Sequence, residues 1–264
     1  MMKEIKFALY AIKKNIQSSS ELRTSFLMNV IGMAINNLAF VFLWVYFVKS
    51  VGIIGGWTTY DIIALNGFCA LSFGLIISIF MGTRKIPEYV SSGSFDRYML
   101  SPKNLILRIA TSAFSPSAVG DAIFGIICLT VYGFLIHISF VQIIFIFILT
   151  IFASIIFFSM TLIINALSFY FIDATSFTDS VFQLFFTPTL FHGGAFHGAM
   201  RFIFTFMIPS LLIAAIPTET IKSVSTTSLL LIGLGSVVWF FIAVKLFNHS
   251  IKRYESSNFM TFGQ

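Results

Sequence analysis

Long apolar runs separated by short polar segments make up most of the chain. Five of these runs are long enough to form membrane-spanning helices, which need around 20 residues to cross the roughly 30 Å hydrocarbon core of a bilayer. The pattern therefore predicts five straight spans. They are Ser25–Val48, Ile62–Met81, Ile109–Ile136, Val141–Phe171 and Thr226–Phe247.

The region between the fourth and the last of these runs is apolar but broken. Over Val181–Ile216 the sequence contains Pro188, a His192-Gly193-Gly194 run and Pro209, and Pro217 follows. One straight span does not fit this pattern. We expect a further span over residues 181–195, and then a re-entrant outer hairpin over about 196–217, because irregular backbone at membrane depth survives only where protein or a cavity shields it. This brings the predicted crossings to six.

The first 24 residues predict an amphipathic helix that lies on the membrane surface. Apolar side chains recur there at helical spacing, and lysines occupy the other faces. A plain cytoplasmic tail is the alternative. The chain then divides into this helix, a transmembrane unit over residues 25–250 and a cytoplasmic tail over 251–264. The apolar set is Ile5, Leu9, Ile12 and Ile16, and the lysines are Lys3, Lys6, Lys13 and Lys14.

Composition supports an all-α integral membrane protein. Of 264 residues, 58% are hydrophobic and 10% are charged, against about 25% charged in soluble domains. The excess of 16 basic over 10 acidic residues lies beside the spans, so it predicts membrane orientation and no nucleic-acid partner. Cys69 and Cys128 lie inside apolar runs, where a disulfide framework or a metal site is not expected.

The basic residues predict that both termini face the cytoplasm, because cytoplasmic segments carry the excess of lysine and arginine. This orientation places 13 of the 16 inside and leaves Lys49, Arg201 and Lys222 outside. The inner set is Lys3, Lys6, Lys13, Lys14, Arg23, Arg84, Lys85, Arg97, Lys103, Arg108, Lys245, Lys252 and Arg253.

The longest polar interruption is Arg84–Lys103, between the second and third spans. Pro87 and Pro102 bracket a stretch long enough for a short helix across the end of the bundle. On this orientation it faces the cytoplasm. We interpret it as the place where something outside the membrane acts on the protein.

Asp121 is the one acid inside a predicted span, near the middle of Ile109–Ile136. A charge at membrane depth is costly, so it usually faces a cavity or a partner. Asp121 either lines a translocation path or bonds a neighbouring span, or else it is protonated or hydrogen-bonded for helix packing, and the sequence leaves these open. Asn165 in the next span is a candidate polar partner and a second candidate for the translocation path, with helix packing as its alternative.

Motifs for catalysis or cofactor binding are missing. Gly193 and Gly198 have the spacing of a phosphate-binding loop, but Ala199-Met200 follow where Lys and Ser or Thr are required. His192 and His197 could meet across a turn near the outer face, either as a ligand site or as ordinary loop polarity. We expect no enzyme activity, no cofactor and no metal in this chain.

The order of the segments resembles the membrane subunit of ABC-2 type ABC transporters, in permeases of about 260 residues. Residues Ser92–Pro102, within Ile86–Pro102, resemble that branch's Gly-x-φ-Asp-x-φ-Leu-x-x-Pro stretch after the second span, where φ is apolar or aromatic. Trp57-x-x-Tyr60 also fits, as do Ile208-Pro209 and Ile216-Pro217. His192-Gly193-Gly194 and Met207 depart from the pattern in the outer region, which leaves the substrate open.

The resemblance implies a six-helix bundle like that of type V ABC exporters, in a cell membrane of bacterial inner or plasma type. It implies a second permease copy or a similar sibling, membrane lipid, and two ABC ATPase subunits that bind ATP and Mg²⁺. Residues 84–103 would hold the coupling helix that seats in the ATPase. The implied coupling residues are Glu88, Tyr89, Gly93, Phe95, Asp96, Arg97 and Tyr98.

The predicted activity is ATP-driven export of an amphipathic or hydrophobic molecule, such as a drug, peptide, lipid or glycan precursor. Phe95 and Tyr98 would anchor in a pocket of the ATPase, and Asp96 and Arg97 would rim it. The main alternative is an ATP-independent secondary carrier or channel, for which Asp121 alone gives thin support. An intramembrane enzyme would need clustered acids or histidines. A membrane anchor or assembly factor would lack a central path.

Overall fold

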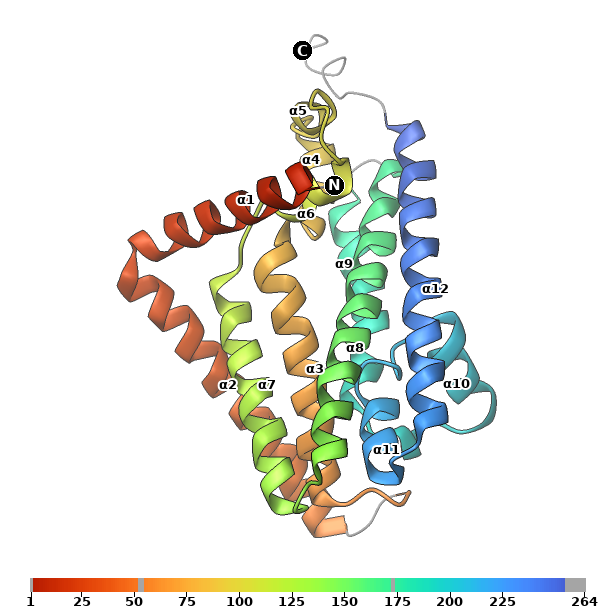
Figure 1. Ribbon diagram of the computed structural model, residues 1–264. Coiled ribbons are helices and arrows are strands. Elements are labelled where there is room, and N and C mark those ends of the chain that lie inside the picture. The colour runs from red at the N-terminus through yellow and green to blue at the C-terminus, as the bar shows by residue number, and fades with distance from the viewer. Residues whose placement is uncertain (1, 52–54, 172–173, 255–264) are drawn as a thin grey trace.

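The computed structural model is a bundle of long helices and describes residues 2–51, 55–171 and 174–254 (Figure 1). Five helices are long and apolar enough to cross a membrane, and no strand occurs among the described residues. The all-helical, multi-pass membrane architecture is therefore confirmed. The five are α2 (Arg23–Val51), α3 (Thr59–Phe80), α7 (Pro116–Leu135), α8 (Phe140–Ala166) and α12 (Thr226–Ser250).

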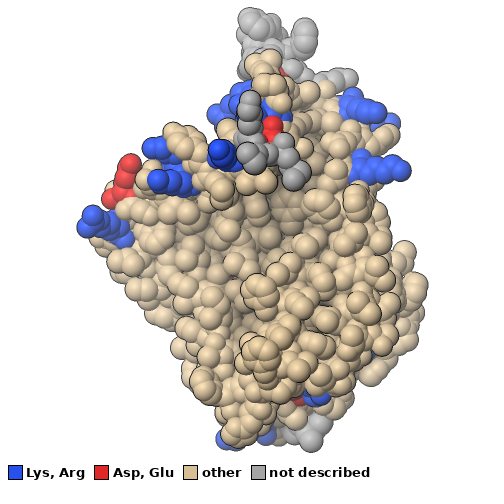
Figure 2. Space-filling model, in the orientation of Figure 1, with Lys and Arg blue, Asp and Glu red and all other residues tan. Residues whose placement is uncertain are grey.

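Shorter elements lie at the two ends of the bundle, which we name the α1 end and the α11 end after the helices they carry (Figure 1). Charged side chains gather at both ends, with a broad uncharged band between them (Figure 2). The α1 end holds α1 (Met2–Glu21), η1 (Met81–Thr83), α4 (Ile86–Ser91), α5 (Asp96–Met99), α6 (Leu105–Ala110), η2 (Leu167–Phe169) and η6 (Ile251–Arg253).

Close packing of α3 against α7 forms the centre of the bundle. A methyl group on Gly67 would lie 2.8 Å from Leu129 Cγ, and one on Gly125 would lie 2.5 Å from Leu71 N. The absence of side chains at these glycines lets the two backbones approach, which is how small residues act in membrane bundles. Helix α3 is consequently the most buried of the five, whereas α2 and α12 expose most of their apolar surface.

The predicted third span, Ile109–Ile136, begins later than expected. Asn104 caps the short helix α6 by accepting a hydrogen bond from Leu107 N at 3.0 Å, and that helix ends at Ala110. Pro116 then starts α7, since proline suits the first turn of a helix. Asp121 is thus the sixth residue of α7, about 7.5 Å along its axis, in the first third of that helix, and its position near mid-depth of the bilayer stays a prediction.

The broken region forms three consecutive segments between α8 and α12. Helix α9 (Thr175–Phe186) and η3 (Thr187–Leu190) run from the α1 end to η4 (Gly193–Ala195) at the α11 end. The chain returns through α10 (Gly198–Phe202) and the π-helix η5 (Ile203–Met207). There Ser210 Oγ donates to Phe185 O at 2.6 Å. Helix α11 (Ala215–Ser223) then leads back to the α11 end.

A helix is present where the first 24 residues predict one, and it crosses the end of the bundle at a steep angle to α2 (Figure 1). Asn15 Nδ2 donates to Thr111 O at 2.9 Å, and Glu4 Oε2 accepts from Asn104 N at 3.2 Å. These bonds hold α1 beside α6. The apolar side chains Ile5 and Leu9 stay more than half exposed, so the described protein leaves this face of α1 uncovered.

Candidate functional site: a polar segment at the α1 end and a cavity between the helices

The segment Arg84–Lys103 folds as two short helices joined by a tight turn. Helix α4 ends at Ser91, and Gly93 has a φ of +68°, a left-handed conformation that glycine adopts without strain. Helix α5 then begins at Asp96. The expected single helix across the bundle end is therefore replaced by a helix-turn-helix, because Gly93 turns the chain between the two prolines.

Phe95 and Tyr98 point into the protein, and their predicted role as anchors in a partner's pocket is wrong. Phe95 is 0% exposed and its ring lies 5.1 Å from that of Phe169 and 4.9 Å from that of Tyr254. Tyr98 is also buried, 5.1 Å from the ring of Tyr89. The sequence shows that aromatic residues are present but not which way they face.

These aromatic side chains fix the segment to the ends of two long helices. They share one apolar cluster with Leu162 and Phe169 near the end of α8 and with Phe247 of α12. Phe169 lies 5.7 Å from Phe247, ring to ring. The segment is therefore in direct contact with the ends of α8 and α12.

Polar contacts tighten the same cluster. Arg97 Nη2 donates to Tyr98 Oη at 3.0 Å, and Arg108 Nη1 donates to Tyr98 O at 3.0 Å. Burial and the neighbouring Asp96 carboxylate raise the pKa of Tyr254 above its usual range. The Tyr254 hydroxyl consequently stays protonated at physiological pH and remains a neutral member of the cluster.

The outward face of the segment consists of side chains that the described part of the protein does not cover. Leu100 is 87% exposed and Met99 is 48% exposed. Glu88 and Arg97 of the same segment are also exposed, and Lys85 Nζ lies 3.7 Å from Glu88 Oε2. An exposed apolar tip flanked by charges has the composition of a protein contact surface. We name Glu88, Arg97, Met99 and Leu100 the exposed tip.

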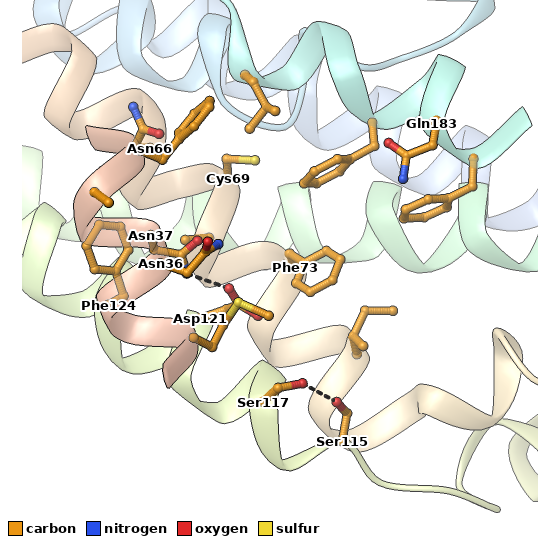
Figure 3. Close-up of a pocket in the computed structure, with 18 of the residues that line it drawn as sticks. Asn36, Asn37, Asn66, Cys69, Phe73, Ser115, Ser117, Asp121, Phe124 and Gln183 are labelled. Atoms are coloured by element: carbon orange, nitrogen blue, oxygen red, sulfur yellow. Dashed lines mark hydrogen bonds between the residues drawn. The ribbon is translucent and has the colours of Figure 1, made fainter. Parts of the chain in front are cut away.

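A cavity of about 700 Å³ lies among α2, α3, α7 and α9 (Figure 3). Arg84, Ser115 and Ser117 line it toward the α1 end, and Leu43 and Leu190 line it toward the α11 end. Five phenylalanines and a group of amides make up much of the rest of its wall. They are Phe40, Phe73, Phe124, Phe182 and Phe186, and Asn36, Asn37, Asn66 and Gln183.

Asp121 lines this cavity and is only half satisfied. Its Oδ1 accepts a hydrogen bond of 2.5 Å from Asn37 Nδ2 of α2 (Figure 3). Its Oδ2 is buried and has no hydrogen-bond partner among the described residues. The residue is 5% exposed. A buried acceptor of this kind is free to take a hydrogen bond from a donor that enters the cavity.

Asn165 is not brought to Asp121. Its Nδ2 donates to Thr161 O of its own helix at 2.7 Å, it is buried against the bundle, and it does not line the cavity. Of the two interpretations of Asn165, helix packing is the one that these contacts favour. The amides beside Asp121 are instead Asn36 and Asn37 (Figure 3), whose signal in the sequence is polar side chains inside an apolar run.

Side chains that lie far apart in the sequence close the α11 end. Lys222 Nζ of α11 lies 2.8 Å from Asp61 Oδ2 of α3 and donates to Gly56 O at 2.9 Å. Arg201 Nη2 pairs with Glu219 Oε2 at 2.6 Å, and the ring of His192 packs 6.0 Å from Trp57. We name the pairs Asp61–Lys222 and Arg201–Glu219 the end closure.

The predicted histidine ligand site gains no support. His192 is buried against Trp57, whereas His197 is exposed. No group of three or more metal-binding side chains occurs in the part of the chain that the structure describes.

Comparison with protein families gives one match, to the model described as ABC-2 family transporter protein, over residues 34–258. The chain belongs to the ABC-2 transporter family. The match covers the segment 84–103, Asp121 and the end closure, so all of these lie in the part shared with ABC-2 proteins. Comparison with curated proteins finds no match, and neither does comparison with solved structures.

Membership makes the chain a multi-pass membrane transport subunit of the ABC permease class rather than a catalytic enzyme. ABC-2 permeases normally work with ABC ATPase subunits. The bundle of long apolar helices agrees with that class.

Proposed function

We propose that the chain is the membrane-spanning subunit of an ATP-driven ABC exporter whose ATP and Mg²⁺ are bound by two separate ATPase subunits. The observation that carries the proposal is the packing of Phe95 onto Phe169 at 5.1 Å in a chain of the ABC-2 family. This contact joins the segment that would meet the ATPase to α8, and through Phe169 to α12.

The orientation places the α1 end in the cytoplasm, with both termini there. The charges support it, since most lysines and arginines belong to α1 and to segments at that end, which is the bias of cytoplasmic loops. Helix α1 then lies at the cytoplasmic membrane surface with Ile5 and Leu9 in the headgroup layer. The α11 end faces outward.

Helix α9 with η3 is the sixth crossing, and residues 196–217 form the re-entrant hairpin. Two contacts support this arrangement. Arg84 Nη2 lies 2.7 Å from Asp179 Oδ1 at the α1 end, whereas His192 packs on Trp57 at the other end of α3. The chain between Asp179 and His192 therefore spans the length of α3, and the return to Ser210 places irregular backbone against Phe185, where protein shields it.

The exposed tip contacts the ATPase, and the buried aromatic cluster transmits the movement. This assigns two roles among the seven coupling residues that the family resemblance implies. Glu88 and Arg97 face the partner, whereas Tyr89, Phe95 and Tyr98 hold the segment to α8 and α12. Gly93 sets the turn that separates them, and Asp96 lies between the two groups beside Tyr254.

Helix α2 faces a second permease subunit, either an identical copy or a sibling. Its apolar side chains Leu27, Met28 and Ile35 are more than half exposed. In the most apolar stretch of α2, 11% of the residues are buried, against 72% in that of α3. The cavity on the flank of α2 then lies beside the partner subunit, where a path shared by two subunits would run.

The cavity is the inward-open part of the export path, and the end closure shuts its outer side. Cargo that enters from the α1 end reaches Asp121 and leaves when ATP-driven movement of α8 and α12 loosens α11 from α3. The apolar wall favours an amphipathic or hydrophobic cargo, such as a drug, peptide, lipid or glycan precursor, over a hydrophilic ion.

The test is ATP hydrolysis in a complex of this chain with a candidate ABC ATPase subunit from the same organism, reconstituted in nanodiscs. Leu100→Asp should lower co-purification of the ATPase and permease-dependent ATP hydrolysis by about tenfold or more, because a charge enters an apolar contact. Val238→Asn, a polar change at an exposed position of α12, should leave both unchanged. If the Leu100 variant binds the ATPase normally, the proposed contact between the exposed tip and the ATPase is wrong. Cargo movement without any ATPase would favour the alternative of an ATP-independent carrier or channel.

A further inference from the structure

We propose that the cavity binds amphipathic amines, with the cationic head at Asp121 and the apolar body along the phenylalanine wall. The inference rests on the proposed export function and deepens it, since it names the chemical class that the path takes up.

The first argument is the unfilled acceptor at Asp121. Asn37 satisfies Oδ1, while Oδ2 is buried without a partner in the described chain. A carboxylate inside a membrane protein is costly unless another group supplies charge or hydrogen bonds. A protonated amine supplies both, since each of its N–H groups donates and its charge opposes that of the carboxylate.

The second argument is that the wall offers no cation of its own for this acid. Among the lining residues, Arg84 is the one basic side chain. Its guanidinium pairs with Asp179 at 2.7 Å and lies 3.8 Å from the centre of the Phe182 ring. Arg84 is thereby engaged at the α1 end of the cavity. An anionic head would meet the Asp121 carboxylate and no free positive charge.

The third argument is the shape and chemistry of the wall beside the acid. Phe73 and Phe124 lie near Asp121 in the cavity (Figure 3), and aromatic faces attract cations. Asn36, which lies next to Asp121 (Figure 3), adds an amide oxygen that accepts a hydrogen bond from an ammonium group. A volume of about 700 Å³ suits a drug-sized molecule, and the rest of the wall is apolar enough for its hydrocarbon part.

The experiment measures binding to the full chain in phosphatidylcholine nanodiscs, without ATPase or ATP. The probe is the fluorescent cation rhodamine 6G, followed by anisotropy after subtraction of empty nanodiscs. Dodecylamine and dodecanoate serve as competitors of equal chain length and opposite charge. Size exclusion and melting temperature establish that each variant is folded. Glu21→Gln, which removes an exposed carboxylate of α1, is the matched control.

Asp121→Asn should weaken rhodamine 6G binding about tenfold or more, dodecylamine should displace the probe, and Glu21→Gln should bind like the wild type. If Asp121→Asn does not fold, Asn36→Lys takes its place in the test. It changes an exposed position and places a competing ammonium group beside the acid, so it should also weaken rhodamine 6G binding. Wild-type affinity in a folded Asp121→Asn or Asn36→Lys variant would overturn the proposal, as would equal displacement by dodecanoate. No ATPase is present in this experiment, so its failure and the failure of the proposed export function can be told apart.

Discussion

Lys222 Nζ lies 2.8 Å from Asp61 Oδ2 and so ties the end of α11 to the first turn of α3. Asp61 is 3% exposed as a residue and also accepts from Thr58 N at 2.7 Å, which caps α3. The pair therefore joins the helix at the centre of the bundle to the segment that precedes α12.

Lys222→Met should lower the melting temperature in nanodiscs, since it leaves a buried carboxylate without its cation. Loss of one partner costs about 3–5 kcal/mol in a fully buried pair and about 0–1 kcal/mol at the surface. Lys222 is partly exposed, so we expect a value between these ranges. A double-mutant cycle with Asp61→Asn measures the coupling. Additive losses in melting temperature would show that the pair contributes nothing to the end closure.

Gly193→Ala should weaken the other pair of the end closure. A Cβ at Gly193 would collide with the Glu219 carboxylate, which accepts from Arg201 at 2.6 Å. The Glu219 carboxylate has to shift to relieve the collision, which disturbs its pair with Arg201, so we expect a small fall in melting temperature. Gly32→Ala is the control, because nothing lies within 4 Å of a Cβ there and alanine favours a helix. Equal melting temperatures for both variants would exclude a role for this contact.

Phe95→Ala should destabilise the folded protein by about 3–5 kcal/mol, because it empties a fully buried ring position. Phe95→Leu should cost less, since it keeps most of the volume. The melting temperatures of the purified variants check the order. A Phe95→Ala protein as stable as the wild type would contradict the placement of this ring between Phe169 and Tyr254. It would favour the first expectation, that Phe95 contacts the ATPase.

Periodicity and apolar length predicted the spans well, because long apolar runs at membrane depth have few other solutions. The start of the third span was missed because the apolar residues Leu105–Ala110 form a separate helix before Pro116. For the same reason Asp121 lies closer to the start of its helix than the apolar run predicts.

Side-chain direction and long-range pairing were beyond the sequence. Phe95 reads equally well as an anchor for a partner or as a core residue, and only the position of Phe169 decides between them. Asp61 and Lys222 are 161 positions apart, and no local pattern relates them. Asn36 and Asn37 stand inside an apolar run, and only the fold shows that they line the cavity at Asp121.

Site-specific photocrosslinking at Leu100 in intact cells tests the central claim most directly. A photoreactive residue at this 87% exposed position should form a crosslink to the ABC ATPase, and the same residue at Val238 on α12 should form none. Absence of the ATPase from the Leu100 product, or labelling of Leu100→Cys by a membrane-impermeant thiol reagent added outside the cell, would contradict the account.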